Sequence, residues 1–220
     1  MIKTITTYLF SFVFLFSFSI QVLAQNEKCA ADELHNYLLA NDAAYKAKND
    51  AFEEAMLVKR NSNNKVAGGQ IYRIPVVVHV MHKGEPLGTG TNVTDAQVLK
   101  WNKALNERYR KVGGTLGDGN GVDMEIEFAL AVRDPNGNCT NGITHNDMSA
   151  NADYMSYGVK RSGTNGISDA QLKAIVSWSK LDYYNIWLIS EIDDNGGSGT
   201  QGYANYASSH GSANDGAVML

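Results

Sequence analysis

Cysteine is scarce in this sequence: the 220 residues contain only two, Cys29 and Cys139. A small scaffold stapled by several disulfide bonds is therefore excluded. The two thiols can pair with each other or serve separately, and their spacing does not decide between these alternatives. An excess of basic charge is also absent, because the formal net charge is −4 at pH 7. This charge gives no electrostatic basis for binding nucleic acid.

Complete catalytic motifs are missing as well. The sequence contains no H-E-x-x-H, no C-x-x-C, no G-x-S-x-G and no G-x-x-x-x-G-K-[ST]. His79 and His82 are three residues apart in an expected strand, so their side chains point to opposite faces and cannot share a metal ion. His145 and His210 each stand alone in an expected loop. Composition and spacing therefore assemble no catalytic site.

A long apolar run occurs only at the N-terminus. Lys3 gives a short positive segment, residues 5–23 are almost entirely apolar or hydroxylated, and Ala24 supplies a small residue at the cleavage position. This pattern predicts a secretory signal peptide over residues 1–24 and hence a secreted protein. An uncleaved membrane anchor is the alternative, because the run is close to spanning length. No later stretch is long and apolar enough to cross a bilayer, so no span is expected after signal cleavage.

Residues 25–70 are expected to form a helical prosegment and a linker. From Asp32 to Arg60, apolar residues recur at three-to-four spacing without proline or glycine, which predicts one helix. The polar stretch "KRNSNNKVAGGQ" follows, over residues 59–70. It opens with the dibasic pair Lys59 and Arg60, which we take as the site where a prosegment is cut off. The alternative is a helix that stays packed on the domain.

Residues 71–220 read as alternating strands and helices. "IPVVVHVM", residues 74–81, is typical of a strand buried on both faces, with Pro75 at its start. Thr94 and Ser168 each begin a capping box that opens a helix. Further strands are expected over residues 122–132, 183–190 and 202–206 and in the closing "GAVML". This order predicts a mixed α/β sheet backed by helices.

One acidic stretch has the pattern of a cation ligand. Residues 191–196, "EIDDNG", place oxygen atoms at alternate positions before a glycine turn, like the front of a calcium loop. Gly202 stands where an EF-hand carries its bidentate acid, which excludes an EF-hand. A calcium site of another geometry and an ordinary Asp-Asn-Gly turn both stay open.

The order of the segments carries a family resemblance. "IPVVVHVM", "VTDAQVLKWNKALNERYR", "IEFALAVRDPNGNCTNGITH", "YYNIWLI", "GYANY" and "DGAVML" follow one another in the chain. In this order they resemble the pappalysin-type metzincin metallopeptidases, exported zinc proteases related to pregnancy-associated plasma protein-A. The resemblance covers about residues 29–220. It implies an α/β (α+β) fold: a metzincin-like upper subdomain with a twisted mixed sheet and backing helices, preceded by a helical prosegment.

The resemblance also implies where function lies. In that family an edge strand binds the substrate in extended form, a role that falls on Gly202, Tyr203 and Ala204 here. The zinc-binding motif H-E-x-x-H-x-x-G-x-x-H follows the strand that "DGAVML" resembles, so every zinc ligand and the general base are expected beyond Leu220.

A cysteine early in the family's prosegment blocks zinc through its thiolate. The corresponding residue here is Cys29 in "EKCAADE". The small Gly-Thr pair that follows this cysteine in the family is replaced by Ala30-Ala31.

The sequence therefore predicts the N-terminal fragment of a secreted, zinc-dependent endopeptidase precursor that acts on proteins or peptides. As supplied, the chain is expected to be inactive, because the zinc motif is absent. The rival hypothesis is a non-catalytic exported module that binds peptides or mediates adhesion. In the first hypothesis residues 71–220 are the incomplete N-terminal part of a catalytic domain. In the second, the same sheet offers an edge that binds peptides without a metal.

Overall fold

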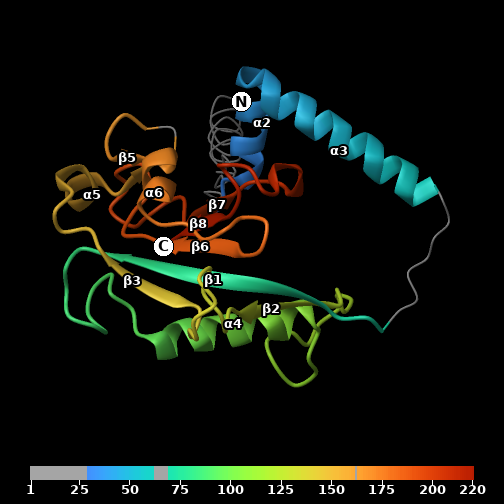
Figure 1. Cartoon of the computed structure of the whole chain (residues 1–220), viewed down its shortest axis with the longest axis horizontal. Coiled ribbons are helices and arrows are strands. Elements are labelled where there is room, and N and C mark those ends of the chain that lie inside the picture. The colour runs from blue at the N-terminus through green and yellow to red at the C-terminus, as the bar shows by residue number, and fades with distance from the viewer. Residues whose placement is uncertain (1–28, 62–68, 162) are drawn as a thin grey trace, which may run out of the picture.

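A computed structural model of the chain describes residues 29–61, 69–161 and 163–220 (Figure 1). The predicted signal peptide and residues 62–68 of the predicted linker lie outside the described residues. Within the described part of the chain, no helix is long and apolar enough to cross a membrane.

The core of the fold is one twisted, mixed sheet. Its order is β2-β1-β6-β8-β7, and β3 pairs with β1 after β2 has ended. All pairs are parallel except that of β7 with β8. The strands are β1 (Tyr72–His82), β2 (Ile126–Leu130), β3 (Ile143–Asp147), β6 (Tyr184–Leu188), β7 (Gly202–Ala204) and β8 (Ala217–Met219), and a separate short pair consists of β4 (Val159–Lys160) and β5 (Ile167–Ser168).

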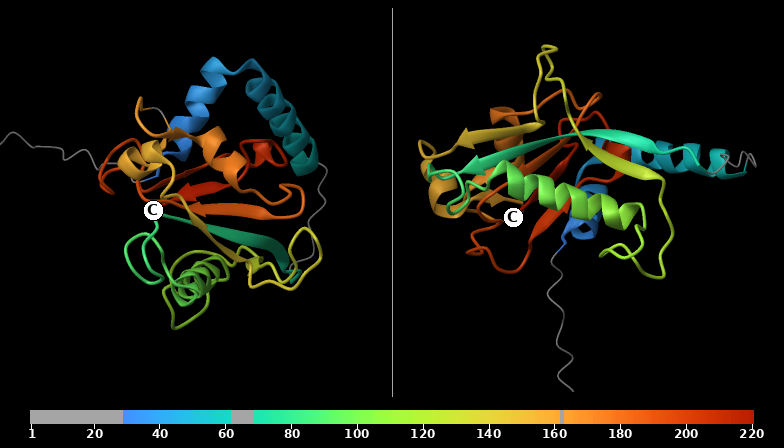
Figure 2. Two further views of the ribbon diagram at one scale, coloured as in Figure 1. Left: turned by 60° about the vertical axis from the view of Figure 1, so that its left-hand side comes forward. Right: turned by 90° about the horizontal axis from the view of Figure 1, so that it is seen from below.

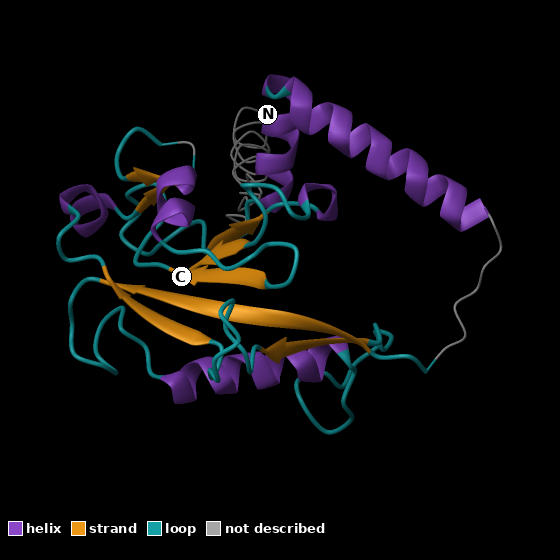
Figure 3. Cartoon of the chain, in the orientation of Figure 1, coloured by secondary structure: helices purple, strands orange, loops and turns teal. Residues whose placement is uncertain are grey.

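Helices cover the two faces of the sheet unequally (Figure 3). On one face α4 packs through Val98 and Trp101 against the valines of β1. On the other face, α2, α5 and α6 enclose a larger cluster centred on Trp187. The left view of Figure 2 shows α4 on the opposite side of the sheet from the other helices. The helices are α2 (Ala31–Asn41), α3 (Ala43–Asn61), α4 (Asp95–Tyr109), α5 (Ala152–Tyr157), α6 (Asp169–Ile175) and the 3₁₀ helix η1 (Ala207–Ser209).

The central strand β1 is the most buried element, as its unbroken apolar run predicts. Every residue from Val76 to Met81 is buried, and four of the five valines and methionines of this stretch contact a core cluster. Pro75 was expected at the start of the strand but is its fourth residue. The sheet tolerates it because β6 pairs with β1 only from Val76 onward, so β1 has a single neighbour at Pro75.

The strand expected over residues 122–132 is shorter than the alternation predicts. Only Ile126–Leu130 pairs with β1, while Val122 and Met124 are exposed. Glu125 has a φ of 56°, a left-handed conformation that a strand cannot contain. The alternating pattern therefore begins before the backbone becomes extended.

Both predicted capping boxes are confirmed. The side chains of Thr94 and Gln97 bond each other's backbone N–H at the start of α4, and Ser168 and Gln171 do the same for α6. Within α6, Leu172 is buried, whereas Ile175 is 48% exposed because the helix ends there. The stretch before residue 166, which shows little pattern in the sequence, contains β3, α5 and β4.

A buried histidine joins three parts of the sheet. His79 is fully buried, with Nδ1 2.8 Å from Thr144 Oγ1 in β3 and Nε2 2.9 Å from Asn185 Oδ1 in β6. Burial lowers the pKa of His79 from 6.5 to about 4, against an opposing hydrogen bond to Asn185. The side chain is therefore neutral in the folded protein at pH 7 and is a core residue, as expected from the sequence.

This pKa predicts acid destabilisation. The folded state excludes a proton that the unfolded chain binds below pH 6.5, so His79 contributes stability above pH 6.5, and this is lost as pH falls toward 4. Urea unfolding of residues 25–220 should show a loss of roughly 2–3 kcal/mol between pH 7 and pH 4.5 from this group. His79→Gln should remove that part of the loss, whereas the exposed His210→Gln should keep it. An unchanged pH dependence in His79→Gln would contradict the assignment.

Candidate functional site at the edge of the sheet

The strand predicted to bind substrate does lie at an edge of the sheet. β7 is the last strand in the order, and β8 pairs with it on one side only, with Tyr203 opposite Val218. Tyr203 is buried, while Gly202 and Ala204 are half-buried. A side chain at Gly202 would meet the Val218 carbonyl oxygen at 3.0 Å, so glycine permits this close approach.

The outer edge of β7 is occupied by the start of the N-terminal segment. Cys29 forms a parallel β-bridge with Gly202, and the Ala30 N–H donates to the Gly202 carbonyl oxygen at 3.0 Å. Ala30 is 3% exposed and belongs to the same core cluster as Tyr203. Cys29 itself is exposed, and it and Cys139 are free thiols. The pairing therefore extends the sheet by two residues of backbone.

The N-terminal segment is a pair of helices rather than the single helix expected over residues 32–60. Asp42 separates α2 from α3 in an extended conformation. Its Oδ1 accepts the backbone N–H groups of Ala44 and Tyr45, both at 2.9 Å, and so caps α3. The apolar spacing alone does not reveal this break, because the capping aspartate interrupts the helix without disturbing the period.

Polar and aromatic contacts attach the two helices to the segment around η1. The His35 ring stacks on Tyr206 with 3.8 Å between centroids, and His35 Nδ1 lies 2.7 Å from the Tyr45 hydroxyl. The Tyr206 hydroxyl donates to Asp32, and Lys48 Nζ donates to a backbone carbonyl near η1 at 3.0 Å. The attachment therefore involves α2 and the first half of α3.

The second half of α3 extends away from the sheet (Figure 1). Met56, Leu57 and Val58 are about half exposed or more, and the buried residues of α3 all lie before residue 50. Lys59 and Arg60, where the expected helix ends and the linker stretch begins, lie in the last turn of α3, and both are exposed. Their use as a cleavage site stays a prediction.

A cavity of about 460 Å³ lies between α2 and the sheet domain. Tyr203 of β7 borders it, and its hydroxyl donates to Asp169 Oδ1 at 2.9 Å. Burial, and then the Asp169 charge, raise the pKa of Tyr203 above its ordinary value, so the phenol stays protonated. Asp169 in turn pairs with the buried Lys173 at 2.9 Å. The cavity is lined by Glu33, Leu34, Tyr37, Leu38, Lys160, Arg161, Gly163, Ser168, Asp169, Ala170, Tyr203, Asn205 and Asn214.

One arginine in this cavity contacts both the N-terminal segment and the domain. Arg161 Nη1 donates to Glu33 Oε2 at 2.6 Å, and Nε donates to Asp193 Oδ2 at 3.4 Å. Asp193 Oδ1 also accepts the backbone N–H groups of Arg161 and Gly163. Desolvation lowers the pKa of Arg161, but the hydrogen bond and charge of Glu33, with those of Asp193, outweigh it and raise the pKa. No local sequence pattern indicates this residue, because its partners are 128 and 32 positions away.

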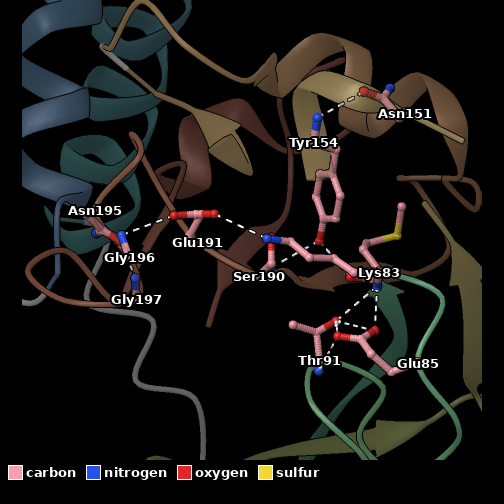
Figure 4. A network of polar contacts seen from close by, with 11 residues as sticks. Lys83, Glu85, Thr91, Asn151, Tyr154, Ser190, Glu191, Asn195, Gly196 and Gly197 are labelled. Carbon is pink, nitrogen blue, oxygen red and sulfur yellow. Dashed lines mark hydrogen bonds and ion pairs between the residues drawn. The ribbon is translucent and has the colours of Figure 1, made fainter. Parts of the chain in front are cut away.

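The acidic stretch over residues 191–196, for which a turn and a calcium site were both open, follows β6 and is held by protein groups (Figure 4). Glu191 is buried; its Oε1 lies 3.3 Å from Lys83 Nζ, and its Oε2 accepts the Gly196 N–H at 3.1 Å. Asp193 accepts from the backbone of residues 161 and 163, as described above. The stretch therefore adopts a turn whose first carboxylates already have donors. Among all described residues, no three His, Cys, Asp or Glu side chains are grouped to hold a metal ion.

Lys83 and Glu191 connect the loops that follow two neighbouring parallel strands, β1 and β6. Glu85 accepts the Lys83 N–H and two donors of Thr91, which orders the first loop. The Tyr154 hydroxyl donates to the Met81 carbonyl and accepts the Ser190 N–H, which fixes the end of β6. The loop that leads into β7 is thus held at its beginning by the central strand.

Removing Lys83 should loosen this connection. Lys83→Met leaves the Glu191 carboxylate buried without its cation, and the expected loss in unfolding free energy is about 1–2 kcal/mol. The matched control is Lys103→Met, which removes a pair with Glu107 in which the lysine side chain is 78% exposed. The control should cost less than about 0.5 kcal/mol. Equal losses in urea unfolding of the two variants would show that the Lys83 pair stabilises no more than a surface pair.

No protein-family model and no curated protein sequence matches the chain. Solved structures of promirolysin and mirolysin are among those similar to the chain. A mutant of promirolysin from Tannerella forsythia is 24% identical over 87% of this chain and 59% of its own, with a TM-score of 0.58. Mature mirolysin from T. forsythia with a cleaved peptide is 28% identical, and mirolysin with a compound is 26% identical; each covers 69% of this chain and 53% of its own, with TM-scores of 0.48 and 0.47.

The likeness to promirolysin concerns the fold. The chain spans 59% of the length of that protein, so the comparison does not extend to the whole of it. Within the shared part, the twisted mixed sheet and its helices have the arrangement seen in promirolysin. The fold class expected from the sequence is therefore confirmed.

Proposed function

We propose that this chain is the N-terminal part of a secreted precursor of a zinc-dependent endopeptidase of the pappalysin type. In this proposal residues 1–24 are the signal peptide and residues 25–70 are a removable prosegment with its linker. Residues 71–220 are the upper part of the catalytic domain, whose substrates are proteins or peptides. The metzincin-like fold supports the proposal.

The observation that carries the proposal is the pairing of the N-terminal segment with β7. An edge strand that receives an extended peptide must present its outer backbone groups to that peptide. Here Gly202, at the start of the strand, faces Cys29 and Ala30, and its carbonyl oxygen accepts the Ala30 N–H. A segment in this position excludes a substrate from the same edge, as an inhibitory prosegment must. Its removal would expose Gly202, Tyr203 and Ala204.

The described residues do not themselves fit a catalytic zinc site. No group of three ligands exists among them. His79 has both ring nitrogens engaged inside the core, and His145 has both engaged by Asn92 and Asp95. We therefore expect the chain to be inactive as supplied, with the zinc ligands in an H-E-x-x-H-x-x-G-x-x-H motif encoded further along. The zinc would polarise the scissile carbonyl and activate water in the whole enzyme.

One face of the sheet is compatible with a larger domain. Leu188, Ala204 and Met219 lie on the face where α4 packs, and all three are only partly buried. α4 contacts β2, on the far side of β1 from these strands. Apolar side chains of three adjacent strands are thus left for another element to cover.

Cys29 is the residue of the prosegment suited to block the metal. It is exposed, carries a free thiol and lies beside the strand that would bind substrate. A thiolate is a strong zinc ligand, so one cysteine is sufficient to fill an open coordination position. Cleavage near Lys59 and Arg60 would cut the covalent link between this cysteine and the domain.

The rival function is a non-catalytic exported module that binds peptides along β7 or mediates adhesion. It is favoured by the burial of Ala30, which is 3% exposed and belongs to the same core cluster as Tyr203. In that case the N-terminal helices are a permanent part of the domain, and the protein binds peptides without any metal.

The coding DNA beyond codon 220 separates the two functions first. The proposal predicts an H-E-x-x-H-x-x-G-x-x-H motif within the next few dozen codons, and a genuine stop codon there would overturn it.

In the precursor encoded by the whole gene, the Cys29→Ala variant should cleave a casein substrate before the prosegment is removed. Cys139→Ala, which removes the other exposed thiol, should stay latent like the unmodified precursor. Equal latency of the two variants would contradict the role of Cys29.

A further inference from the structure

The pair formed by Arg161 and Glu33 is asymmetric. The Arg161 side chain is 9% exposed and is fixed on the domain, since both its backbone N–H and its Nε donate to Asp193. The Glu33 side chain is 69% exposed and belongs to the segment that we propose to be removable. The Arg161 guanidinium is thus held in place by the domain, whereas the Glu33 carboxylate is contributed by the N-terminal segment. An oriented guanidinium is suited to bind a carboxylate.

The charges around the cavity also favour an anion at this position. Lys160 and Arg161 both line it. The one other acid in its lining, Asp169, is already paired with Lys173 at 2.9 Å and accepts the Tyr203 hydroxyl. Asp193 pairs with Arg161 at 3.4 Å. Without Glu33, the three bases Lys160, Arg161 and Lys173 still exceed the two acids Asp169 and Asp193 by one positive charge. This positive charge attracts an acidic side chain and repels a basic one.

The same cavity touches the strand that would receive a peptide. Tyr203 of β7 lines it together with Arg161, so a peptide beside β7 passes within reach of the guanidinium. The N-terminal segment demonstrates the geometry: Ala30 pairs with Gly202, and Glu33, three residues later, contacts Arg161. Leu34 then packs on the core cluster. Backbone pairing, a carboxylate contact and an apolar contact thus follow one another within five residues of one segment.

We infer that Arg161 and the cavity beside it form a recognition site for an acidic side chain of a peptide that lies along β7. Glu33 occupies this site in the chain described here. The inference rests on the proposed function in one respect, that the N-terminal segment leaves β7. It adds a substrate class: peptides with an aspartate or glutamate a few residues from the part that pairs with β7. Arg161 thereby becomes a residue that determines specificity.

The test is a binding competition on the full chain. Residues 25–220 carrying a site-specific protease sequence within residues 62–68 are cleaved after folding, so that the N-terminal piece is held by non-covalent contacts alone. A labelled peptide of residues 29–61 then exchanges into the complex, and its Kd is measured by fluorescence anisotropy. The Glu33→Gln peptide should bind about tenfold more weakly, the loss expected for one charge-assisted contact. The Glu53→Gln peptide is the matched control, because Glu53 is exposed on α3 and the change removes the same charge; it should bind like the parent peptide.

A second comparison tests whether Arg161 recognises acidic peptides in general or contacts only Glu33 of its own chain. Unrelated extended decapeptides with one glutamate are compared with the same peptides carrying glutamine, as competitors for the labelled segment. The glutamate peptides should compete about tenfold better, and Arg161→Gln should abolish this difference while leaving the Kd of the Glu33→Gln peptide unchanged. Equal competition by the two sets would overturn the inference. The inference would also be overturned if Arg161→Gln weakened the binding of every peptide by the same factor, because a merely structural role of Arg161 gives that result.

These measurements need neither zinc nor proteolysis. If the whole gene encodes no zinc motif, the difference between glutamate and glutamine peptides still decides the inference. If the precursor with Cys29→Ala is active but the two peptide sets compete equally, only the inference fails.

Discussion

The outer edge of β7 is the constraint on which the rest of the candidate site depends. A strand at the end of a sheet exposes a row of backbone donors and acceptors that water, another strand or a partner must satisfy. Here the Ala30 N–H meets the Gly202 carbonyl, and α2 starts at the very next residue. This pairing places α2 above the edge, which in turn brings Glu33 to Arg161 and closes the cavity over Tyr203.

The contacts of the N-terminal segment weaken along its length. Its first residues combine backbone pairing with burial: Ala30 is in the core cluster and Leu34 packs against it. The middle of the segment relies on the stacking of His35 on Tyr206 and on hydrogen bonds at the surface. The last turns of α3 are exposed and contain Lys59 and Arg60. A segment with this gradient is held where it covers the edge strand and is accessible where a protease would act.

The features of the fold that depend on neighbouring residues could be predicted from the sequence. The contacts between residues far apart in the chain could not. The capping residues Thr94 and Ser168 bond backbone groups three positions away, so the sequence predicts where these helices begin. The unbroken valine run of β1 likewise predicts that this strand is buried. The family order of the segments indicated that β7 is an edge. The left-handed Glu125 and the cap at Asp42 were missed because neither disturbs the apolar period. The contacts of Arg161 join segments far apart in the chain, and no local pattern encodes them.

The central claim is that the N-terminal segment extends the sheet at β7, and amide hydrogen exchange of residues 25–220 tests it most directly. The Ala30 N–H is buried and donates to Gly202, whereas Gly113 lies in an exposed loop. The account predicts that the Ala30 amide exchanges at least about 100-fold more slowly than its unstructured rate, while Gly113 exchanges close to that rate. An Ala30 amide that exchanges as fast as that of Gly113 would contradict the pairing, and with it the proposal that this segment blocks the edge.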